Sequence, residues 1–446
     1  MSQSTRFQRL LEVLGLHRPE LRAWAMYDWA ITGFYAVIVV AVFPIYFQDV
    51  AAADIPSELA TQHFATATTL ALVIVAAVAP ILGAITDYIA AKKRLLATFA
   101  GIGVAAVAGM YFIHEGNWVL AATLFIIANI GANGSMIFYD AMLPHIANQK
   151  EIDRVSTAGF AVGYCGATLI LAATLFLILQ PELFGFAQDS TTPVRLAFVG
   201  VALWWMAFTI PLLLRVPEPP VAVEDPDAAL TTVIRMGLVR LKRTFGELRG
   251  YKHAFLMLLA FLIYNDGIGT IIRMATIYGR ELGLETTALV GSIMVVQVVG
   301  IPFTFLFGMI AARIGTKPSL FIGLFVYMLI SVLAYFMTTA VHFMMLAFLV
   351  GMVQGGTQAL SRSLFASMIP GHKSGEFFGF FAVFEKFAGI FGPAIFAAMI
   401  ALTGSSREAI LSIIAFFIIG GLILTFVDVD EGRAVARQAE RDVGLV

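Results

Sequence analysis

The segment GAITDYIAAKKR at residues 83–94 joins two long apolar runs, and the segment GMIAARIGTKP at residues 308–318 joins two others. In each segment a glycine is followed by basic residues before the next run begins. The first segment also carries an acid, Asp87, and Ala312 stands in the corresponding place of the second. Because both segments follow the second apolar run of their half of the chain, they indicate an internal repeat.

Apolar runs of this kind recur from end to end of the chain. Of 446 residues, 60% are hydrophobic and 13% are charged, which leaves too few charges to coat a soluble protein of this length. A helix needs about 20 apolar residues to cross about 30 Å of hydrocarbon. Runs of suitable length lie at 24–47, 64–86, 95–113, 118–143, 158–179, 196–214, 254–279, 288–312, 319–337, 342–366, 377–401 and 409–427. The sequence therefore predicts an all-α polytopic membrane protein with twelve transmembrane helices in two six-helix halves.

Lysine and arginine collect on one side of the predicted membrane. The chain ends, the central linker and the loop containing Lys92 lie on that side, whereas the opposite loops carry Arg195, Arg280 and Arg407. Basic loops are retained in the cytoplasm, so we expect both termini there and an even number of crossings. The resulting divisions are a cytoplasmic segment at 1–23, a helix bundle at 24–215, a cytoplasmic linker at 216–253, a second bundle at 254–428 and a cytoplasmic tail at 429–446.

The central linker contains apolar residues at helical spacing between Leu230 and Leu248, with arginines and a lysine among them. This pattern is typical of an amphipathic helix lying on a membrane surface. A soluble helix packed on the rest of the protein would show the same pattern, and both alternatives stay open.

The residues of segment 83–94 have separate physical uses. Gly83 allows a close approach of two helices, and Asp87 can cap the positive end of a neighbouring helix. Lys92, Lys93 and Arg94 can bind lipid headgroups and keep the loop inside the cell. The simpler alternative is a tight turn whose basic residues only fix the topology.

Polar and charged residues within the predicted spans follow a pattern with a period of three helices. Charged groups are costly in hydrocarbon and usually face a cavity or a partner. The third, sixth, ninth and twelfth spans carry none, so they can face lipid. The polar positions considered are Asp28, Asn129, Asn133, Asp140, Asn265, Asp266, Arg273, Gln354, Gln358, Arg362, Glu385 and Lys386. This distribution favours a central cavity lined by the first helix of each three-helix repeat.

Depth within the spans separates these residues into two sets. Asp28, Asp140 and Arg362 lie near the cytoplasmic ends, which favours an ion pair or a gate. The substrate or proton pathway is predicted to contain Asp266, Asn265, Arg273, Glu385, Lys386, Gln354, Gln358 and Asn133. We expect Asp266 or Glu385 to exchange a proton and Arg273 and Lys386 to attract an anionic group such as a carboxylate. A permanent Asp266–Lys386 pair is the alternative.

Segment 83–94 resembles the signature loop of the major facilitator superfamily, in which a glycine and an acid precede basic residues. Longer stretches resemble the vacuolar effluxer family of that superfamily, the autophagy-related amino-acid permeases and their bacterial relatives. These stretches are WAMYDWAITGFYAVIVVAVFPIYF from Trp24, FYDAMLPHIA from Phe138, VSTAGFAVGYCG from Val155, FLIYNDGIGTIIRMATIYG from Phe261, GGTQALSRSLFASMIP from Gly355 and GEFFGFFAVFEKFAGIFGP from Gly375. The resemblance implies the major facilitator fold, secondary transport by alternating access and a latch between the halves at the loop containing Asp87, Lys92, Lys93 and Arg94. Fungal members are described as exporting amino acids.

The sequence contains none of the motifs considered for nucleotide-driven pumps, hydrolases or metalloproteases. It has no GxxxxGK[ST] loop for a nucleotide, no GxSxG nucleophile motif and no pair of histidines at metalloprotease spacing, so we expect neither an enzyme nor a cofactor or metal. The net charge of −1 gives no sign of nucleic-acid binding. We expect a small-molecule substrate, a coupling proton or ion, membrane lipids as surroundings and a monomer in a bacterial cytoplasmic membrane. A transporter fold acting as a sensor or scaffold is the alternative.

Overall fold

The computed structural model describes residues 3–87, 90–188, 190–220, 250–281, 286–388, 391–403 and 406–444. Within these ranges the regular structure is entirely helical, and eleven helices are long and apolar enough to cross a membrane. The prediction of an all-helical membrane protein is therefore confirmed. The expected linker helix between residues 230 and 248 lies outside the described residues.

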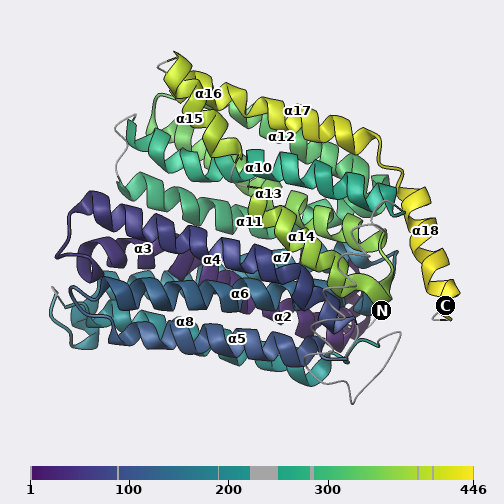
Figure 1. The fold of residues 1–446 in the computed structure, drawn as a ribbon, viewed down its shortest axis with the longest axis horizontal. Helices are drawn as coiled ribbons and strands as arrows, with labels where there is room; N and C mark the ends of the chain where they lie inside the picture. Colours follow the sequence, from purple (N-terminus) through teal and green to yellow (C-terminus); the bar gives the residue numbers. More distant parts are fainter. Residues whose placement is uncertain are drawn as a thin grey trace.

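Two groups of helices make up the molecule, one on each side of the central linker. The first contains α1 (Gln3–Val13), α2 (Pro19–Phe34), η1 (Tyr35–Ala41), α3 (Phe43–Tyr46), η2 (Phe47–Ala51), α4 (Ser57–Thr86), α5 (Lys92–Gly109), η3 (Met110–Phe112), α6 (Trp118–Ile146), α7 (Ile152–Leu179), η4 (Pro181–Phe184) and α8 (Thr192–Arg215). The second contains α10 (Lys252–Glu281), α11 (Thr286–Ile314), α12 (Thr316–Tyr335), α13 (Ala340–Ser367), η5 (Gly371–Lys373), α14 (Ser374–Phe387), α15 (Phe391–Thr403), α16 (Ser406–Ser412), α17 (Ile414–Thr425) and α18 (Val429–Asp442). We call α2–α8 the N-terminal group and α10–α17 the C-terminal group. Figure 1 shows them lying side by side, with the two chain termini at the same end of the helices.

The first predicted span is a single long rod that passes twice from α-helical to π-helical winding. It runs from Pro19 to Ala51 and passes through two π-helical stretches, η1 and η2. The backbone N–H of Val42 donates to the carbonyl of Val37, five residues earlier, at 2.8 Å. Pro44 lies between the two stretches and cannot donate a backbone hydrogen bond, which disturbs the regular α-helical pattern there. The wider winding begins at Tyr35.

The run predicted at 377–401 is not one continuous helix. It divides into α14, which ends at Phe387, and α15, which begins at Phe391. Ala388 has an extended backbone, with ψ of 102°. Pro393 explains why a helix restarts here, because proline fits the first turn of a helix but breaks a helix interior. The interruption lies at Ala388, and Gly392 and Pro393 belong to the first turn of α15, so a twelfth crossing stays a prediction.

The two groups meet along a few close helix pairs. Helix α4 packs on α14, and α7 packs on α11 and α13. Gly83 of α4 and Gly375 of α14 approach so closely that a Cβ atom on Gly83 would overlap the carbonyl of Gly375. A Cβ atom on Gly308 of α11 would likewise overlap the side chain of Thr157 on α7. Glycine is therefore needed where the groups touch.

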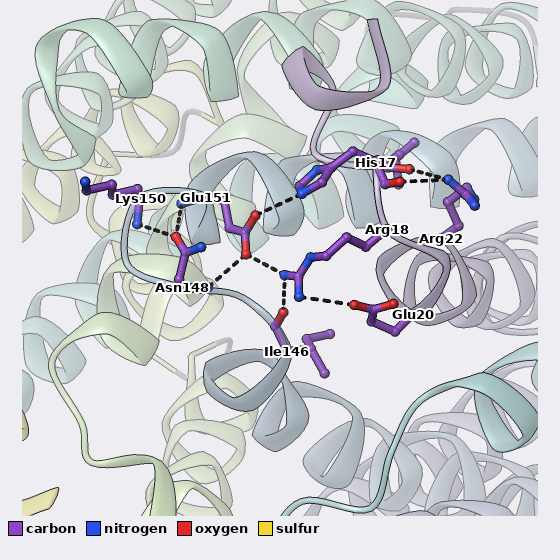
Figure 2. Close-up of polar contacts among 9 residues, drawn as sticks. His17, Arg18, Glu20, Arg22, Ile146, Asn148, Lys150 and Glu151 are labelled. Atoms are coloured by element: carbon purple, nitrogen blue, oxygen red, sulfur yellow. Dashed lines mark hydrogen bonds and ion pairs between the residues drawn. The ribbon is translucent and has the colours of Figure 1, made fainter. Parts of the chain in front are cut away.

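The chain ends hold the turns that follow α6 and α13. Figure 2 shows Arg18, which donates to the carbonyl of Ile146 at 2.6 Å and pairs with Glu151, while His17 lies 3.4 Å from the same carboxylate. At the other end of the chain, Glu440 of α18 accepts the backbone N–H of Gly371 at 2.8 Å. The N-terminal segment therefore stabilises the turn after α6, and α18 stabilises the turn after α13. Both turns lie next to the contact between the two groups.

Candidate functional site

A cavity of about 460 Å³ lies between the two groups. Its wall is mostly apolar, with side chains such as Ile31, Met136 and Val350. The polar and charged side chains in the wall are Asp28, Thr32, Tyr35, Asp140, Tyr164, Asn265, Ser292, Gln297, Ser331, Gln354, Gln358, Arg362, Glu385 and Lys386. An apolar enclosure with a few convergent polar groups is typical of a site for a small molecule.

One part of the cavity wall is an ionic cluster that joins the two groups. Arg362 on α13 donates through Nη1 to Asp140 Oδ1 at 3.0 Å, and its Nη2 lies 3.4 Å from Asp28 Oδ2. All three side chains are buried. The sequence placed these residues together at one end of the spans, and the structure brings them into direct contact.

Residues of the N-terminal group surround the guanidinium of Arg362 on its remaining sides. Ser156 on α7 accepts from Nε through its hydroxyl, at 2.9 Å, and from Nη2 through its carbonyl, at 3.0 Å. The rings of Trp24, Tyr139 and Phe160 lie 4.9, 5.6 and 4.5 Å from the guanidinium carbon. Tyr139 also donates to Asp28 Oδ2 at 2.7 Å. Arginine suits this site because its flat cation can pair with acids and stack on rings at the same time.

The acid of segment 83–94 lies at the start of a helix from the other group. Asp87 directly follows α4, and its two carboxylate oxygens accept the backbone N–H groups of Gly375 and Glu376 at 2.9 and 2.7 Å. Lys92 is buried and lies 2.8 Å from Asp87 Oδ1. The N–H groups at a helix start lack partners within their own helix, and a carboxylate satisfies them and suits the positive end of the helix dipole.

The other two basic residues of this segment are placed differently. The backbone N–H of Lys93 donates to the carboxylate of Glu218 at 3.1 Å, and the side chain of Arg94 is exposed. Of the three basic residues, Lys92 is therefore the one that takes part in the contact with α14.

A second charged pair lies in the cavity wall on α14. Lys386 Nζ lies 3.2 Å from Glu385 Oε1, and the Glu385 side chain is 41% exposed against 17% for Lys386. Asn265, Gln354 and Gln358 also line the cavity. The structure thus pairs Lys386 with its neighbour Glu385.

Three residues of the predicted pathway are not part of the cavity wall. Asp266 is buried and its Oδ2 accepts the backbone N–H of Gly392 at 2.8 Å, at the start of α15. Arg273 donates through Nε to the carbonyl of Gly269 in its own helix at 3.0 Å. Asn133 accepts from the hydroxyl of Tyr35 at 3.1 Å and so supports a cavity residue from outside. Asp266 and Arg273 need not address one cavity despite their seven-residue spacing.

Gln297 and Ser156 are polar residues near the cavity that were not predicted from the sequence. Gln297 lines the cavity from α11, and none of the residues that the structure describes forms a hydrogen bond with its buried Oε1. An amide within the apolar run VVQVVG is a usable signal, and it could have been found. Ser156 could not, because a serine in a helix is common and nothing local marks it as a ligand of Arg362.

The fold is the one found in solved transporters of the major facilitator superfamily. The proton:xylose symporter XylE has the same fold, with a TM-score of 0.70 and 16% identity over 92% of this chain and 95% of that one. FucP, a major facilitator transporter solved in the outward conformation, gives a TM-score of 0.65 and 13% identity over 92% of this chain and 100% of that one.

The sequence comparisons give the family. A model of the Atg22-like vacuole effluxers matches residues 17–437, so the chain belongs to that family. The MFS-type transporter YxiO of Bacillus subtilis is 37% identical over 419 residues, 93% of this chain and 96% of that protein. Autophagy-related protein 22 of Coccidioides immitis is 25% identical over 461 residues, 85% of this chain and 75% of that protein. The chain is therefore an integral membrane transporter of the major facilitator type, as its sequence predicted.

Proposed function

We propose that this protein carries a small zwitterionic solute, such as an amino acid, across a bacterial cytoplasmic membrane by alternating access, working as a monomer. The observation that carries the proposal is the cavity between the two groups, with Glu385 and Lys386 side by side in its wall. Its volume of about 460 Å³ lies within the range of roughly 300–1,000 Å³ that is usual for small-molecule sites. A carboxylate and an ammonium on one helix can address both charges of a zwitterion.

We assign twelve crossings to the chain, with α14 and α15 together forming a discontinuous eleventh. The N-terminal and C-terminal groups then each have six crossings, and both termini lie in the cytoplasm. Helices that break near the middle of a membrane commonly border the substrate sites of transporters, which supports a substrate site beside Lys386.

With this orientation the cavity is closed toward the cytoplasm. The ionic cluster of Arg362, Asp28 and Asp140 and the contact of Asp87 with α14 both lie at the cytoplasmic end and both join the two groups. Solute would enter from the opposite end in this conformation. Separation of these contacts would open the cytoplasmic side, so we assign Asp28, Asp140 and Arg362 to a gate and Asp87 with Lys92 to a latch.

We assign supporting roles to the three residues of the predicted pathway that are not part of the cavity wall. Asp266 fixes the start of α15 beside the substrate, and Asn133 orients Tyr35. Arg273 adds positive charge on the C-terminal group. The proposal does not require Asp266 to exchange a proton.

Counterflow of labelled amino acids in proteoliposomes tests the proposal. We expect exchange by the native protein and a loss of apparent affinity of about tenfold or more in Glu385→Gln, because a hydrogen bond to a charged group contributes about 1.5–3 kcal/mol. Glu408→Gln, the same change at an exposed position of α16 that is not in the cavity wall, is the matched control. Thermal stabilisation by an amino acid without counterflow would show a sensor in place of a carrier, and neither effect with any amino acid would reject the substrate class.

A further inference from the structure

The ionic cluster between the groups contains two acids and one base. Asp28, Asp140 and Arg362 are 4%, 8% and 2% exposed, so water screens none of them well. Arg362 contacts both carboxylates, at 3.4 Å to Asp28 and 3.0 Å to Asp140. With both acids ionised, the cluster holds an excess of one negative charge inside the membrane.

Among the residues that the structure describes, Arg362 is the cation that pairs with both acids. The charged groups with the largest effect on Asp140 are Arg362, Asp28 and Glu385, and Glu385 adds negative charge. Lys386 is paired with Glu385. The neighbours on α2, α6 and α7 are neutral: Tyr139 donates to Asp28, Tyr27 is bonded to Ser135, and Ser156 binds Arg362. An unpaired charge in a medium of low dielectric constant is costly, and a carboxylate there removes the cost by taking up a proton.

The two acids are not equivalent as proton acceptors. Asp28 is held by the hydroxyl of Tyr139 as well as by Arg362, and both contacts favour its ionised form. Asp140 accepts from Arg362 alone among the described contacts of its side chain, and that side chain is 11% exposed against 5% for Asp28. Both acids are part of the cavity wall, so water in the cavity can deliver a proton to Asp140. Asp140 is therefore the acid of the pair that is free to change its charge.

We infer that Asp140 is the binding site of the coupling proton, and that Arg362 transmits its occupancy to the cytoplasmic gate. The inference rests on the proposed transport function and names its coupling ion. A proton passes from water in the cavity to the carboxylate of Asp140, which becomes a neutral acid, and Arg362 is then held by one carboxylate in place of two. The contact of α13 with α6 weakens, so the cytoplasmic side opens and the proton can leave on that side.

Asp140 takes the proton-binding role that the sequence predicted for Asp266 or Glu385. Asp266 is engaged with Gly392 at the start of α15, within its own group, so a change in its charge would not act on a contact between the groups. Glu385 faces the cavity beside Lys386 and suits the solute better. The Asp140–Arg362 pair joins α6 to α13, and the charge of Asp140 therefore acts directly on the gate.

Cysteine labelling tests the inference without any solute. Thr157 is buried where α7 meets α11, so a cysteine there, in a background in which the single native Cys165 is serine, reacts with a maleimide when the cytoplasmic side opens. We expect the labelling rate to rise about tenfold as the pH is lowered, a usual size for coupling between two sites. Infrared difference spectra should show the carbonyl band of a protonated carboxylic acid growing over the same pH series.

Two variants with opposite outcomes make the test decisive. Asp140→Asn imitates the protonated acid, so labelling should be fast at every pH and the infrared band should be absent. In Asp28→Asn, Asp140 and Arg362 form a neutral pair. Protonation of Asp140 would leave Arg362 without an ionised acid, so Asp140 should stay ionised and labelling should stay slow over the same series. Asp153→Asn is the control, because it removes an acid that bonds Ser363 and Thr316 across the same contact. It should speed labelling without changing the dependence on pH.

A native pH response and a native infrared band in Asp140→Asn would overturn the inference, and so would an unaltered response in Asp28→Asn. If either asparagine variant fails to fold, Asp140→Glu keeps an acid at the site and must retain the band with a shifted midpoint. Counterflow is measured separately. Its absence in the native protein would reject the transport proposal and leave the proton site standing, whereas counterflow with an unchanged Asp140→Asn titration would reject the proton site alone.

Discussion

The carboxylate of Asp87 lies 2.9 Å from the backbone nitrogen of Gly375, although 288 positions separate the two residues in the chain. Asp87 directly follows α4 and Gly375 is the second residue of α14, so the contact joins the N-terminal group to the C-terminal group. The same carboxylate holds the buried ammonium of Lys92. One side chain thus satisfies a helix start in one group and a buried cation in the other.

Loss of Asp87 should weaken the whole contact. In Asp87→Ala the backbone N–H groups of Gly375 and Glu376 lose their acceptor, and Lys92 is left buried without an acid. Breaking a buried charged pair costs about 3–5 kcal/mol, so we predict a clear fall in the thermal unfolding temperature and faster labelling of the cysteine at position 157. Asp87→Asn keeps one acceptor oxygen and should have a smaller effect. Asp49→Ala, an exposed acid on η2, is the control, and an unfolding temperature of Asp87→Ala equal to that of this control would contradict the prediction.

The close approach of α4 to α14 gives a second prediction. In Gly83→Ala the new methyl group meets the carbonyl of Gly375, whereas in Gly101→Ala on α5 it meets nothing within 4 Å. Overpacking costs about 1–3 kcal/mol, so Gly83→Ala should lower the unfolding temperature and favour the cytoplasm-open state. Gly101→Ala should be neutral or slightly stabilising, by up to about 1 kcal/mol, because alanine is the better helix former. Equal behaviour of the two variants would show that the groups are not in contact at Gly83.

Variants of Asp266 distinguish a structural role of this residue from a role in proton coupling. Its Oδ2 accepts the N–H of Gly392, and asparagine can supply the same acceptor oxygen. We predict nearly native stability and counterflow for Asp266→Asn, and a loss of about 1–3 kcal/mol for Asp266→Ala, with faster amide exchange in α15. A stable Asp266→Asn protein that no longer exchanges solute would instead assign Asp266 to the transport cycle.

The tail helix α18 should respond to acid through its first residue. Asp428 precedes the helix, lies outside the membrane-spanning helices and accepts the N–H of Glu431 at 3.0 Å. This hydrogen bond lowers the pKa of the Asp428 carboxyl below its ordinary value. Because the folded-state pKa is the lower one, the cap contributes fully above the unfolded-state pKa and is lost as the pH falls through the folded-state pKa.

We therefore predict lower protection of the amides of residues 429–442 at acid pH than at neutral pH, measured by hydrogen exchange and corrected for the intrinsic rate. Asp428→Ala should show the low protection at both pH values, and Asp428→Asn should keep the cap without the dependence on pH. Asp442→Ala removes an acid from the other end of α18 and serves as the control. A native response to acid in Asp428→Asn would place the titrating group elsewhere.

The positions of the helices could be predicted because membrane crossing depends on local composition. Eleven of the twelve predicted runs coincide with single apolar helices or rods, although α2 begins earlier than expected, at Pro19. The eleventh run does not form one helix, although its residues stay apolar through Ala388. The signal that the sequence offers near this break is the Gly392–Pro393 step just after it. All the residues at a helix break can be apolar, so hydropathy alone does not reveal the break.

The sequence selected the residues of the candidate site by their type and gave no information about their partners. Glu385, Lys386, Gln354 and Gln358 line the cavity, and Asp28, Asp140 and Arg362 are together. Asp266 was expected beside the cavity, since an acid well inside a span is costly without water or a cation. The structure gives it the N–H of Gly392, from a helix start that the sequence did not reveal.

The sequence by itself determined that the protein lies in a membrane, roughly where its helices run and which few positions carry buried charge, because these properties follow from the residues next to each other in the chain. The tertiary structure decided which charges meet. Arg362 finds Asp28 and Asp140, which lie 334 and 222 positions away, and Asp87 finds the start of α14. Such pairs form only when whole helices pack, and the energy of a buried charge depends on the atoms a few ångströms away, wherever they stand in the sequence.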